Sequence, residues 1–246
     1  MTAFALSKPY MDVGLFTNRG AEMREFYGGE IGLAPIDELD IETGYRLYRF
    51  DASGSALKIN DLDEPMEPAT TCFRRIVLPV ADPSQARALE DPDGNAVVLV
   101  PMGQMDVTQL GIVWAVASLE QAEDFAERAL GAERLAAGRY RVGKTTLIFD
   151  EAPEAKRSGA MEAIGFTYTT LHVKDVFGTH AHLLSTGCQE AIPVTPFGEV
   201  TTYSFIRDPF GGWFEVSQRA DLAGSLARVE GPALGQEEIR AIRQSA

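Results

Sequence analysis

The stretch Ile206-Arg-Asp-Pro-Phe-Gly-Gly-Trp-Phe-Glu-Val-Ser-Gln218 has the pattern of two strands joined by a tight turn. Asp208-Pro209 opens the turn, because proline presets its φ angle for the first corner position. The two glycines that follow supply backbone freedom, including positive φ. In the second strand Trp213, Glu215 and Ser217 share one face. Glu215 is therefore predicted to be a carboxylate among apolar neighbours, which needs a partner or a ligand because buried carboxylates are rare without one.

The bulk composition limits the classes of function and partner. The chain has 246 residues, of which 45% are hydrophobic, enough for one large core or two small ones. Its formal net charge of −14 and pI near 4.7 argue against nucleic acid and anionic membrane surfaces as partners. No apolar run approaches the ~20 residues of a membrane span, and the first ten residues lack a secretory pattern. With Cys72 and Cys188 alone, we predict no disulfide framework and a reduced, cytoplasmic location.

Strand and helix patterns divide most of the chain into four similar units. The expected strands, hairpins and helices of these units have the following ranges: 12–17, 21–32 and 45–60; 73–80 and 96–100; 110–116, 122–130 and 139–149; 164–173, 177–185, 201–207 and 213–217. The second unit has little room for a helix and is predicted to be abbreviated. Asn18 and Ser118 are the expected helix caps. A short polar helix at 236–244 is predicted to be peripheral.

The two halves of the chain look like copies of each other. Phe26 precedes Ile31-Gly32 by the same spacing with which Phe125 precedes Leu130-Gly131. The turn that begins at Asp91-Pro92 also resembles the turn at Asp208-Pro209. A single unit would leave one face of its sheet exposed, whereas pairing two units buries that face or closes a cup.

Strand–helix–strand–strand–strand units that end in Asp-Pro-x-Gly plus a strand resemble the vicinal oxygen chelate superfamily. That superfamily includes glyoxalase I, the bleomycin-resistance proteins and the extradiol dioxygenases. The resemblance implies an α+β fold of four βαβββ-type modules, the second one abbreviated, paired into two cup-shaped half-barrel sheets with helices outside. It also implies an amino-terminal, structural module pair at 8–104, a carboxy-terminal pair with the candidate site at 109–220, and a tail with a short helix at 221–246. Whether the first module pairs with the second or the fourth stays open.

The resemblance also indicates where a divalent metal would bind. In such families a typical ligand is a Glu seven residues after the Asp of the turn, and counting from Asp208 gives Glu215, a match. The dioxygenase pattern would place histidines at Gly111 and Tyr168, so both imidazole donors are missing. We therefore predict no metal-binding residue and no cofactor, since a divalent cation would find only Glu215 at a family ligand position.

The corresponding positions in the amino-terminal half are occupied by Asp12, Lys58, Arg75 and Val98. If the first two modules pair, these charges would form an ion-pair cluster where a metal would otherwise sit. A register one residue off would instead leave some of the charges in solvent.

The candidate site residues lie in the fourth unit. Glu215, Tyr168 and His172 are the candidate catalytic residues, because a carboxylate in an apolar cup can act as an acid or base. Glu215 could equally be a relic of a lost metal site, now paired with Tyr168 or another donor. His172 shares a strand face with Tyr168 and is interpreted as a hydrogen-bonded histidine of the cavity or core. His180 and His182, on a helix, are predicted to be surface residues.

A second set of residues is predicted to line the cup and bind substrate: Tyr203, Phe205, Trp213 and Thr170. An aromatic lining with a few polar groups suits a small, flat ligand. Core packing is the alternative for these aromatic residues.

The function predicted from the resemblance is that of a glyoxalase- or extradiol-dioxygenase-like protein. It would act on a small aromatic or carbonyl compound by metal-independent acid–base chemistry of the isomerase or lyase type. Two alternatives stay open: a non-catalytic binding protein of the bleomycin-resistance kind, and a metal-dependent dioxygenase with unusual ligands. The expected partner is a small-molecule ligand, with no nucleic acid and no membrane. The sheet edge left by the abbreviated module would allow a homodimer.

Overall fold

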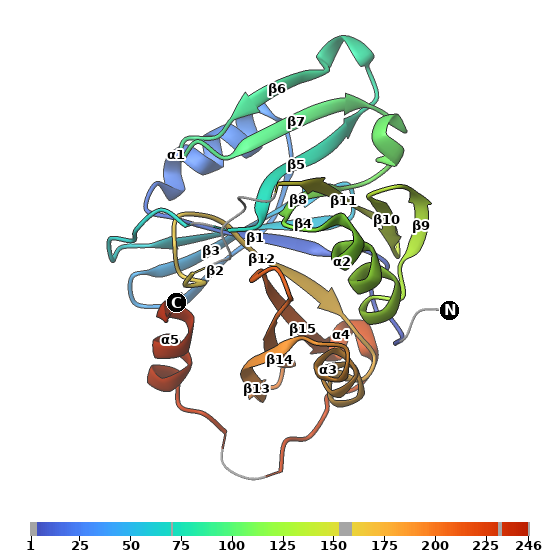
Figure 1. Cartoon of the computed structure of the whole chain (residues 1–246). Coiled ribbons are helices and arrows are strands. Elements are labelled where there is room, and N and C mark those ends of the chain that lie inside the picture. Colours follow the sequence, from blue (N-terminus) through green and yellow to red (C-terminus); the bar gives the residue numbers. More distant parts are fainter. Residues whose placement is uncertain (1–3, 70, 153–158, 231–232, 246) are drawn as a thin grey trace.

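The computed structural model describes residues 4–69, 71–152, 159–230 and 233–245, and its strands form two mixed sheets (Figure 1). The eight-stranded sheet has the order β13-β14-β15-β12-β1-β4-β3-β2. The seven-stranded sheet has the order β6-β7-β5-β8-β11-β10-β9. The predicted α+β fold of four modules in two cup-shaped sheets is confirmed.

The eight-stranded sheet consists of the first and fourth modules. Their elements are β1 (Asp12–Thr17), α1 (Gly20–Arg24) with the π-helix η1 (Glu25–Glu30), β2 (Ala34–Glu42), β3 (Tyr45–Ala52) and β4 (Ser55–Leu62), then β12 (Gly165–His172), α3 (Val176–Ser185), β13 (Gln189–Phe197), β14 (Thr201–Arg207) and β15 (Trp213–Arg219). The modules meet where β1 pairs with β12 in antiparallel fashion.

The seven-stranded sheet consists of the second and third modules. Their elements are β5 (Phe73–Val80), η2 (Pro83–Gln85), β6 (Arg87–Glu90), β7 (Ala96–Pro101) and η3 (Gln104–Asp106), then β8 (Gly111–Val116), α2 (Leu119–Asp124) with the π-helix η4 (Phe125–Ala129), β9 (Glu133–Ala136), β10 (Arg139–Val142) and β11 (Thr145–Glu151). A single 3₁₀ turn stands between β5 and β6, where the other modules carry an α-helix, so the predicted abbreviation is confirmed.

The structure settles which modules pair. The first pairs with the fourth through β1 and β12, and the second pairs with the third through β5 and β8. Each sheet therefore takes one module from each half of the chain. The expected halves 8–104 and 109–220 do not each form a sheet. In both sheets a strand of the first half is hydrogen-bonded to a strand of the second half, β1 to β12 and β5 to β8.

The two Asp-Pro turns have the same internal geometry, which supports the repeat. Asp208 Oδ1 accepts the backbone N–H groups of Phe210 at 2.7 Å and Gly212 at 2.9 Å. Asp91 Oδ1 likewise accepts the N–H groups two and four residues later, at 3.1 and 2.8 Å. Gly211 has a φ of 86°, a value that favours glycine at this position.

Side-chain caps were expected at the start of two helices, and one of the two is present. Ser118 Oγ accepts the backbone N–H of Gln121 at 3.3 Å, as predicted. The prediction for Asn18 is wrong, because its side chain binds the last residue of β4 and the linker that follows, and α1 has no side-chain cap. Asn18 Nδ2 donates to the carbonyl of Leu62 at 2.6 Å, and its Oδ1 accepts from Met66 N–H at 3.0 Å.

The main hydrophobic core lies between the two sheets. Leu15 of β1, Ile112 and Trp114 of β8 and Phe214 of β15 are all fully buried in it. Trp114 meets Phe214 edge-on at 5.5 Å between ring centroids, so the sheets pack directly on each other. Side chains of α1, α2 and α3 join the same core. The concave face of each sheet points away from this core, so its side chains do not take part in packing the two sheets together.

Two helices follow the fourth module, α4 (Ala220–Ala223) and α5 (Gln236–Gln244). The predicted bounds of the last helix are confirmed. Its one buried residue, Ile239, is 1% exposed and belongs to a core cluster on the concave side of the eight-stranded sheet. In the described part of the chain, no helix has the length and apolar character that a membrane crossing requires.

Candidate functional site

A charged triad occupies the centre of the concave face of the eight-stranded sheet. Lys58 of β4 donates from Nζ to Glu215 Oε2 and to Thr170 Oγ1, each at 2.7 Å. Thr170 Oγ1 in turn donates to Glu215 Oε2 at 2.7 Å. Thr170 and Glu215 are register partners on β12 and β15, so adjacent strands place them side by side.

The triad holds a nearly buried carboxylate in its ionised form. Burial raises the pKa of Glu215, but the charge and hydrogen bond of Lys58, with the hydroxyl of Thr170, lower it below its usual value. The side chain of Glu215 is 16% exposed, against 9% for Lys58. Glu215 is therefore the member of the triad that a small molecule can reach most directly.

Gly14 makes room for an aromatic ring beside this triad. In register, Gly14 of β1 lies between Lys58 of β4 and Tyr168 of β12. A Cβ atom at position 14 would lie 2.0 Å from Tyr168 Cε1. The absent side chain lets the Tyr168 ring lie across β1, where its centroid is 5.5 Å from Lys58 Nζ.

A second buried pair lies at one end of the triad. His172 Nε2 is 2.7 Å from Asp12 Oδ2, and both residues are 3% exposed. Asp12 Oδ1 also accepts from Lys8 Nζ at 2.6 Å and from the Ala56 N–H at 2.7 Å. Burial raises the pKa of Asp12, but His172, Lys58 and Lys8 together hold it well below its usual range. His172 Nδ1 is buried and has no hydrogen-bond partner among the described residues.

Aromatic side chains cover the other end of the concave face. Tyr168 contacts Phe205 at 6.0 Å between ring centroids, and Phe205 contacts Tyr203 at 5.8 Å and Trp213 at 6.2 Å. Burial raises the pKa of Tyr168 far above its usual value, so its hydroxyl stays protonated. Ile239 of α5 packs into this aromatic group and covers it.

The structure brings most of the predicted site residues together. Glu215 touches Thr170, and Tyr168 lies in the aromatic group of Tyr203, Phe205 and Trp213. The sequence did not reveal that Lys58 and Asp12 would join them. The available signal was that Lys58 follows Asp51 by seven residues, the same interval by which Glu215 follows Asp208.

The predicted ion-pair cluster of the amino-terminal half does not form. Arg75 lies in the seven-stranded sheet and pairs with Asp150 at 2.9 Å, whereas Asp12 and Lys58 lie in the other sheet. Val98 packs against a small apolar cluster there. The expectation failed because the first module pairs with the fourth and not with the second.

The prediction that His180 is a surface residue is also wrong. His180 is 7% exposed, and its Nδ1 lies 2.9 Å from Ser204 Oγ. Its Nε2 lies 2.9 Å from Glu190 Oε2. His182 is half-buried, with Nε2 at 3.1 Å from the carbonyl of Ala129. Helix α3 therefore packs closely on β14, and the face of α3 that carries His180 is buried against this strand.

The donor set of the cup does not fit a divalent metal. The ammonium group of Lys58 lies against Glu215, the one residue that matches a family ligand, and a second cation there would be repelled. Among the described residues, no group of three or more His, Cys, Asp or Glu side chains is placed to hold a metal ion. In the other cup, the apolar side chains of Val77, Val98 and Val113 offer no ligand atoms.

Comparison with known proteins agrees with this architecture. Residues 110–216 match the model of the Glyoxalase/Bleomycin resistance protein/Dioxygenase superfamily. Glyoxalase I from Zea mays is 13% identical with a TM-score of 0.68, over 86% of this chain and 94% of its own. A putative dioxygenase from Bacillus subtilis subsp. subtilis str. 168 is 14% identical with a TM-score of 0.64, over 98% and 97%. The cppA protein from Streptococcus pneumoniae TIGR4 is 9% identical with a TM-score of 0.53, over 89% and 100%. A search of the curated proteins by sequence finds no match.

Four modules in two cupped sheets, with the candidate site inside one cup, define the vicinal oxygen chelate class of fold. Residues 110–216, which make up the third and fourth modules, match the model of the glyoxalase, bleomycin-resistance and dioxygenase superfamily, and the whole chain shares the fold of glyoxalase I. The resemblance inferred from the sequence is confirmed.

Proposed function

We propose that this protein is a metal-independent enzyme that moves a proton on a small aromatic or carbonyl compound bound in the eight-stranded cup. The observation that carries the proposal is the position of Lys58, whose ammonium group contacts Glu215 and Thr170 at 2.7 Å each. A cation of the chain itself stands where the family would place a metal. It can stabilise negative charge on a substrate oxygen, as a metal would.

Glu215 is the candidate proton acceptor. It is ionised in the resting state because Lys58 lowers its pKa. A substrate oxygen that accepts a hydrogen bond from Lys58 would share that positive charge, so the proton affinity of Glu215 would rise when substrate binds. The carboxylate would then take a proton from the carbon next to the substrate carbonyl.

Tyr168 and His172 supply the remaining acid–base groups. The raised pKa of Tyr168 keeps its hydroxyl available as a hydrogen-bond donor to substrate. His172 is oriented by Asp12 through Nε2, and its buried Nδ1 has no hydrogen-bond partner among the described residues. A carboxylate that holds an imidazole in this way is a common arrangement for an acid–base histidine.

Proton exchange in D₂O tests this function without knowledge of the substrate. Aryl ketones, α-hydroxy ketones and 2-oxo acids are incubated with the protein, and NMR follows deuterium entering at the carbon next to the carbonyl. We expect Glu215→Gln and Lys58→Met each to slow exchange at least about 100-fold, while the exposed Glu64→Gln matches the wild type. Exchange that survives Glu215→Gln, or that a chelator abolishes, would refute the proposal.

A non-catalytic binding protein is the second candidate, and the covering of the aromatic group by α5 favours it. Trp213 is 1% exposed and Phe205 is 5% exposed, so the apolar end of the cup is closed as in a sequestering site. Binding of a compound by Glu215→Gln with wild-type affinity, with no exchange by either protein, would support this second function.

A further inference from the structure

We propose that α5 occupies the ligand's place in the cup, and that the ligand is a flat aromatic compound with a carboxylate or enolate oxygen at one end. Ile239, the buried residue of α5, clusters with the side chains that line the aromatic end of the concave face: Phe16, Tyr45, Tyr168, Ile192, Tyr203, Phe205 and Trp213. This inference rests on the proposed function, because it places the oxygen end of the ligand at Lys58.

The aromatic end and the charged triad form one continuous surface. Phe205 is the register partner of Glu215 on the neighbouring strand. The Tyr168 ring contacts Phe205 and also lies 5.5 Å from Lys58 Nζ. A ligand that displaces Ile239 would therefore rest its rings on aromatic side chains and direct a polar end toward Lys58 and Thr170. Offset or edge-on contacts between aromatic rings favour a flat ligand at this surface.

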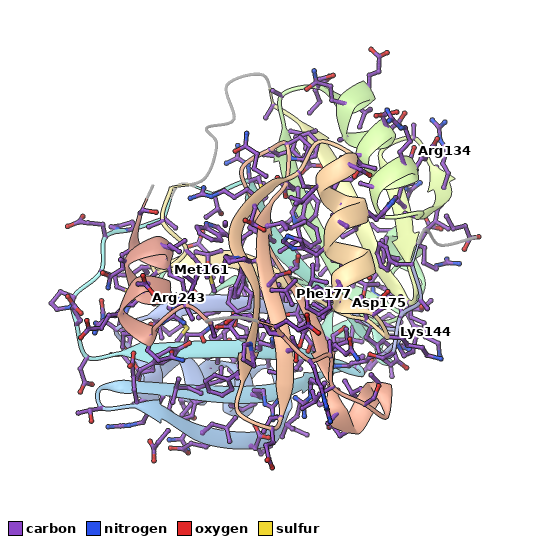
Figure 2. The ribbon with its side chains drawn as sticks, turned by 90° about the horizontal axis from the view of Figure 1, so that it is seen from below. Arg134, Lys144, Met161, Asp175, Phe177 and Arg243 are labelled. Carbon is purple, nitrogen blue, oxygen red and sulfur yellow. The ribbon has the colours of Figure 1, made fainter. Side chains whose placement is uncertain are left out.

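A small number of polar contacts hold α5 in place. Arg243 lies 2.8 Å from Glu162 through Nε, and both side chains are mostly buried. The carbonyl of Arg243 accepts the N–H groups of Met161 at 2.7 Å and Glu162 at 3.1 Å. Figure 2 shows Met161 and Arg243 together at this helix. On the outer face, Arg240 pairs with Glu64 where both side chains are exposed.

Exchange of α5 for a ligand is energetically reasonable. A nine-residue helix is marginal in water by itself, so α5 depends on its contacts with the cup. Without a cover the aromatic side chains would face water, and a flat ligand would replace the apolar contact that Ile239 makes. A groove of about 1110 Å³ runs beside α5, and Trp213, Arg207 and Ile242 are among its walls. The groove provides open space next to α5 at Trp213.

Weakening the attachment of α5 tests the inference on the full chain. Arg243→Ala removes the buried ion pair and should raise the affinity for 2-naphthoate, measured by calorimetry, at least about tenfold, because more molecules are open for binding. Arg240→Ala, on the exposed face of the same helix, is the matched control and should stay within about twofold of the wild type. Ile239→Ala is a second weakening variant, in case Arg243→Ala folds poorly.

Two further measurements locate the ligand. Acrylamide should quench Trp213 more strongly in Arg243→Ala, whereas the fully buried Trp114 stays protected. 2-Naphthoate should speed hydrogen exchange at the amides of α5 in the wild type. Equal affinity in Arg243→Ala, Ile239→Ala and Arg240→Ala, or binding with α5 still protected, would overturn the inference. Failure of the proposed function would look different: Lys58→Met and Glu215→Gln would then exchange protons as the wild type does, whatever α5 does.

Discussion

Lys58 and Glu215 are 157 residues apart in the chain, yet their charged groups meet at 2.7 Å in the middle of the eight-stranded cup. β4 and β15 supply the two side chains, and β1 and β12 lie between them in the sheet. The pair therefore exists only because the first module binds the fourth. Its charges depend on each other, since each would otherwise be a nearly buried ion without a counter-charge.

Lys58→Met should be strongly destabilising. The substitution leaves Glu215 beside an apolar side chain, so the pKa of Glu215 should rise and the free energy of unfolding should fall by about 3 kcal/mol. Urea unfolding at pH 7 measures this change. The double variant Lys58→Met with Glu215→Gln should lose less than the sum of the two single changes, because neither charge is then left alone. Additive losses would contradict this coupling.

Asp12→Asn should remove part of the acid sensitivity of the fold. The pKa of Asp12 is lowered in the folded state, so its contribution is present above about pH 4 and is lost as the pH falls through the folded pKa. We expect the variant to be less stable than the wild type by roughly 2–4 kcal/mol at pH 7. The difference between the two stability curves should shrink as the pH falls from about 4 to 2. A constant difference from pH 7 to pH 2 would show that the charge of Asp12 is not the cause.

The local elements could be predicted from the sequence, because their signals are local. The strands that the pattern placed, the two Asp-Pro turns and the capping serine are found there, whereas β2, β9 and β13 were not predicted. Pairing could not be predicted, since β1 and β12 join residues about 150 positions apart and either partner would bury the same apolar face. The ion-pair cluster was predicted on the assumption that the first module pairs with the second. It does not form, because the first module pairs with the fourth.

The position of the helix at 236–244 could not be predicted from the sequence either. Its bounds follow from its charged, helix-forming residues, but those same charges led to the prediction of a peripheral position. The available signal was weak: Ile239 and Ile242 are three residues apart and share one face of an otherwise polar helix. Nothing in the sequence indicates that this narrow apolar face covers the aromatic group that contains Tyr203 and Phe205.

Asp208→Asn should stabilise the protein at alkaline pH. Burial raises the pKa of Asp208 to about 7, although its backbone hydrogen bonds lower it, and its Oδ2 has no hydrogen-bond partner among the described residues. A raised carboxyl pKa means that stability falls as the pH rises from about 4 through 7. The amide keeps the oxygen that accepts from Phe210 and Gly212, and it removes the charge. We expect a gain of roughly 1–3 kcal/mol at pH 8 and little change at pH 4.

The equivalent change in the other turn is the control for Asp208. Asp91 Oδ2 accepts from the Tyr27 hydroxyl at 2.8 Å and from Asn95 Nδ2 at 2.9 Å. An amide at that position would direct N–H groups toward donors, so Asp91→Asn should be destabilising at both pH values. If thermal or urea unfolding shows the same response for both variants, the unpartnered oxygen of Asp208 is not the cause.

Gly14→Ala should disrupt the centre of the site. The added methyl group would lie 2.0 Å from Cε1 and 2.1 Å from Cζ of Tyr168, on a strand paired on both sides. Neither backbone can move freely, so we expect a loss of about 3 kcal/mol or more in the free energy of unfolding.

Tyr168→Ala alone should be destabilising through the cavity that it leaves. Combining it with Gly14→Ala should recover much of the loss from the methyl group, because the ring that meets it is gone. Unfolding of the four proteins in urea measures the coupling, and a value near zero would mean that Tyr168 does not lie across Gly14 in solution.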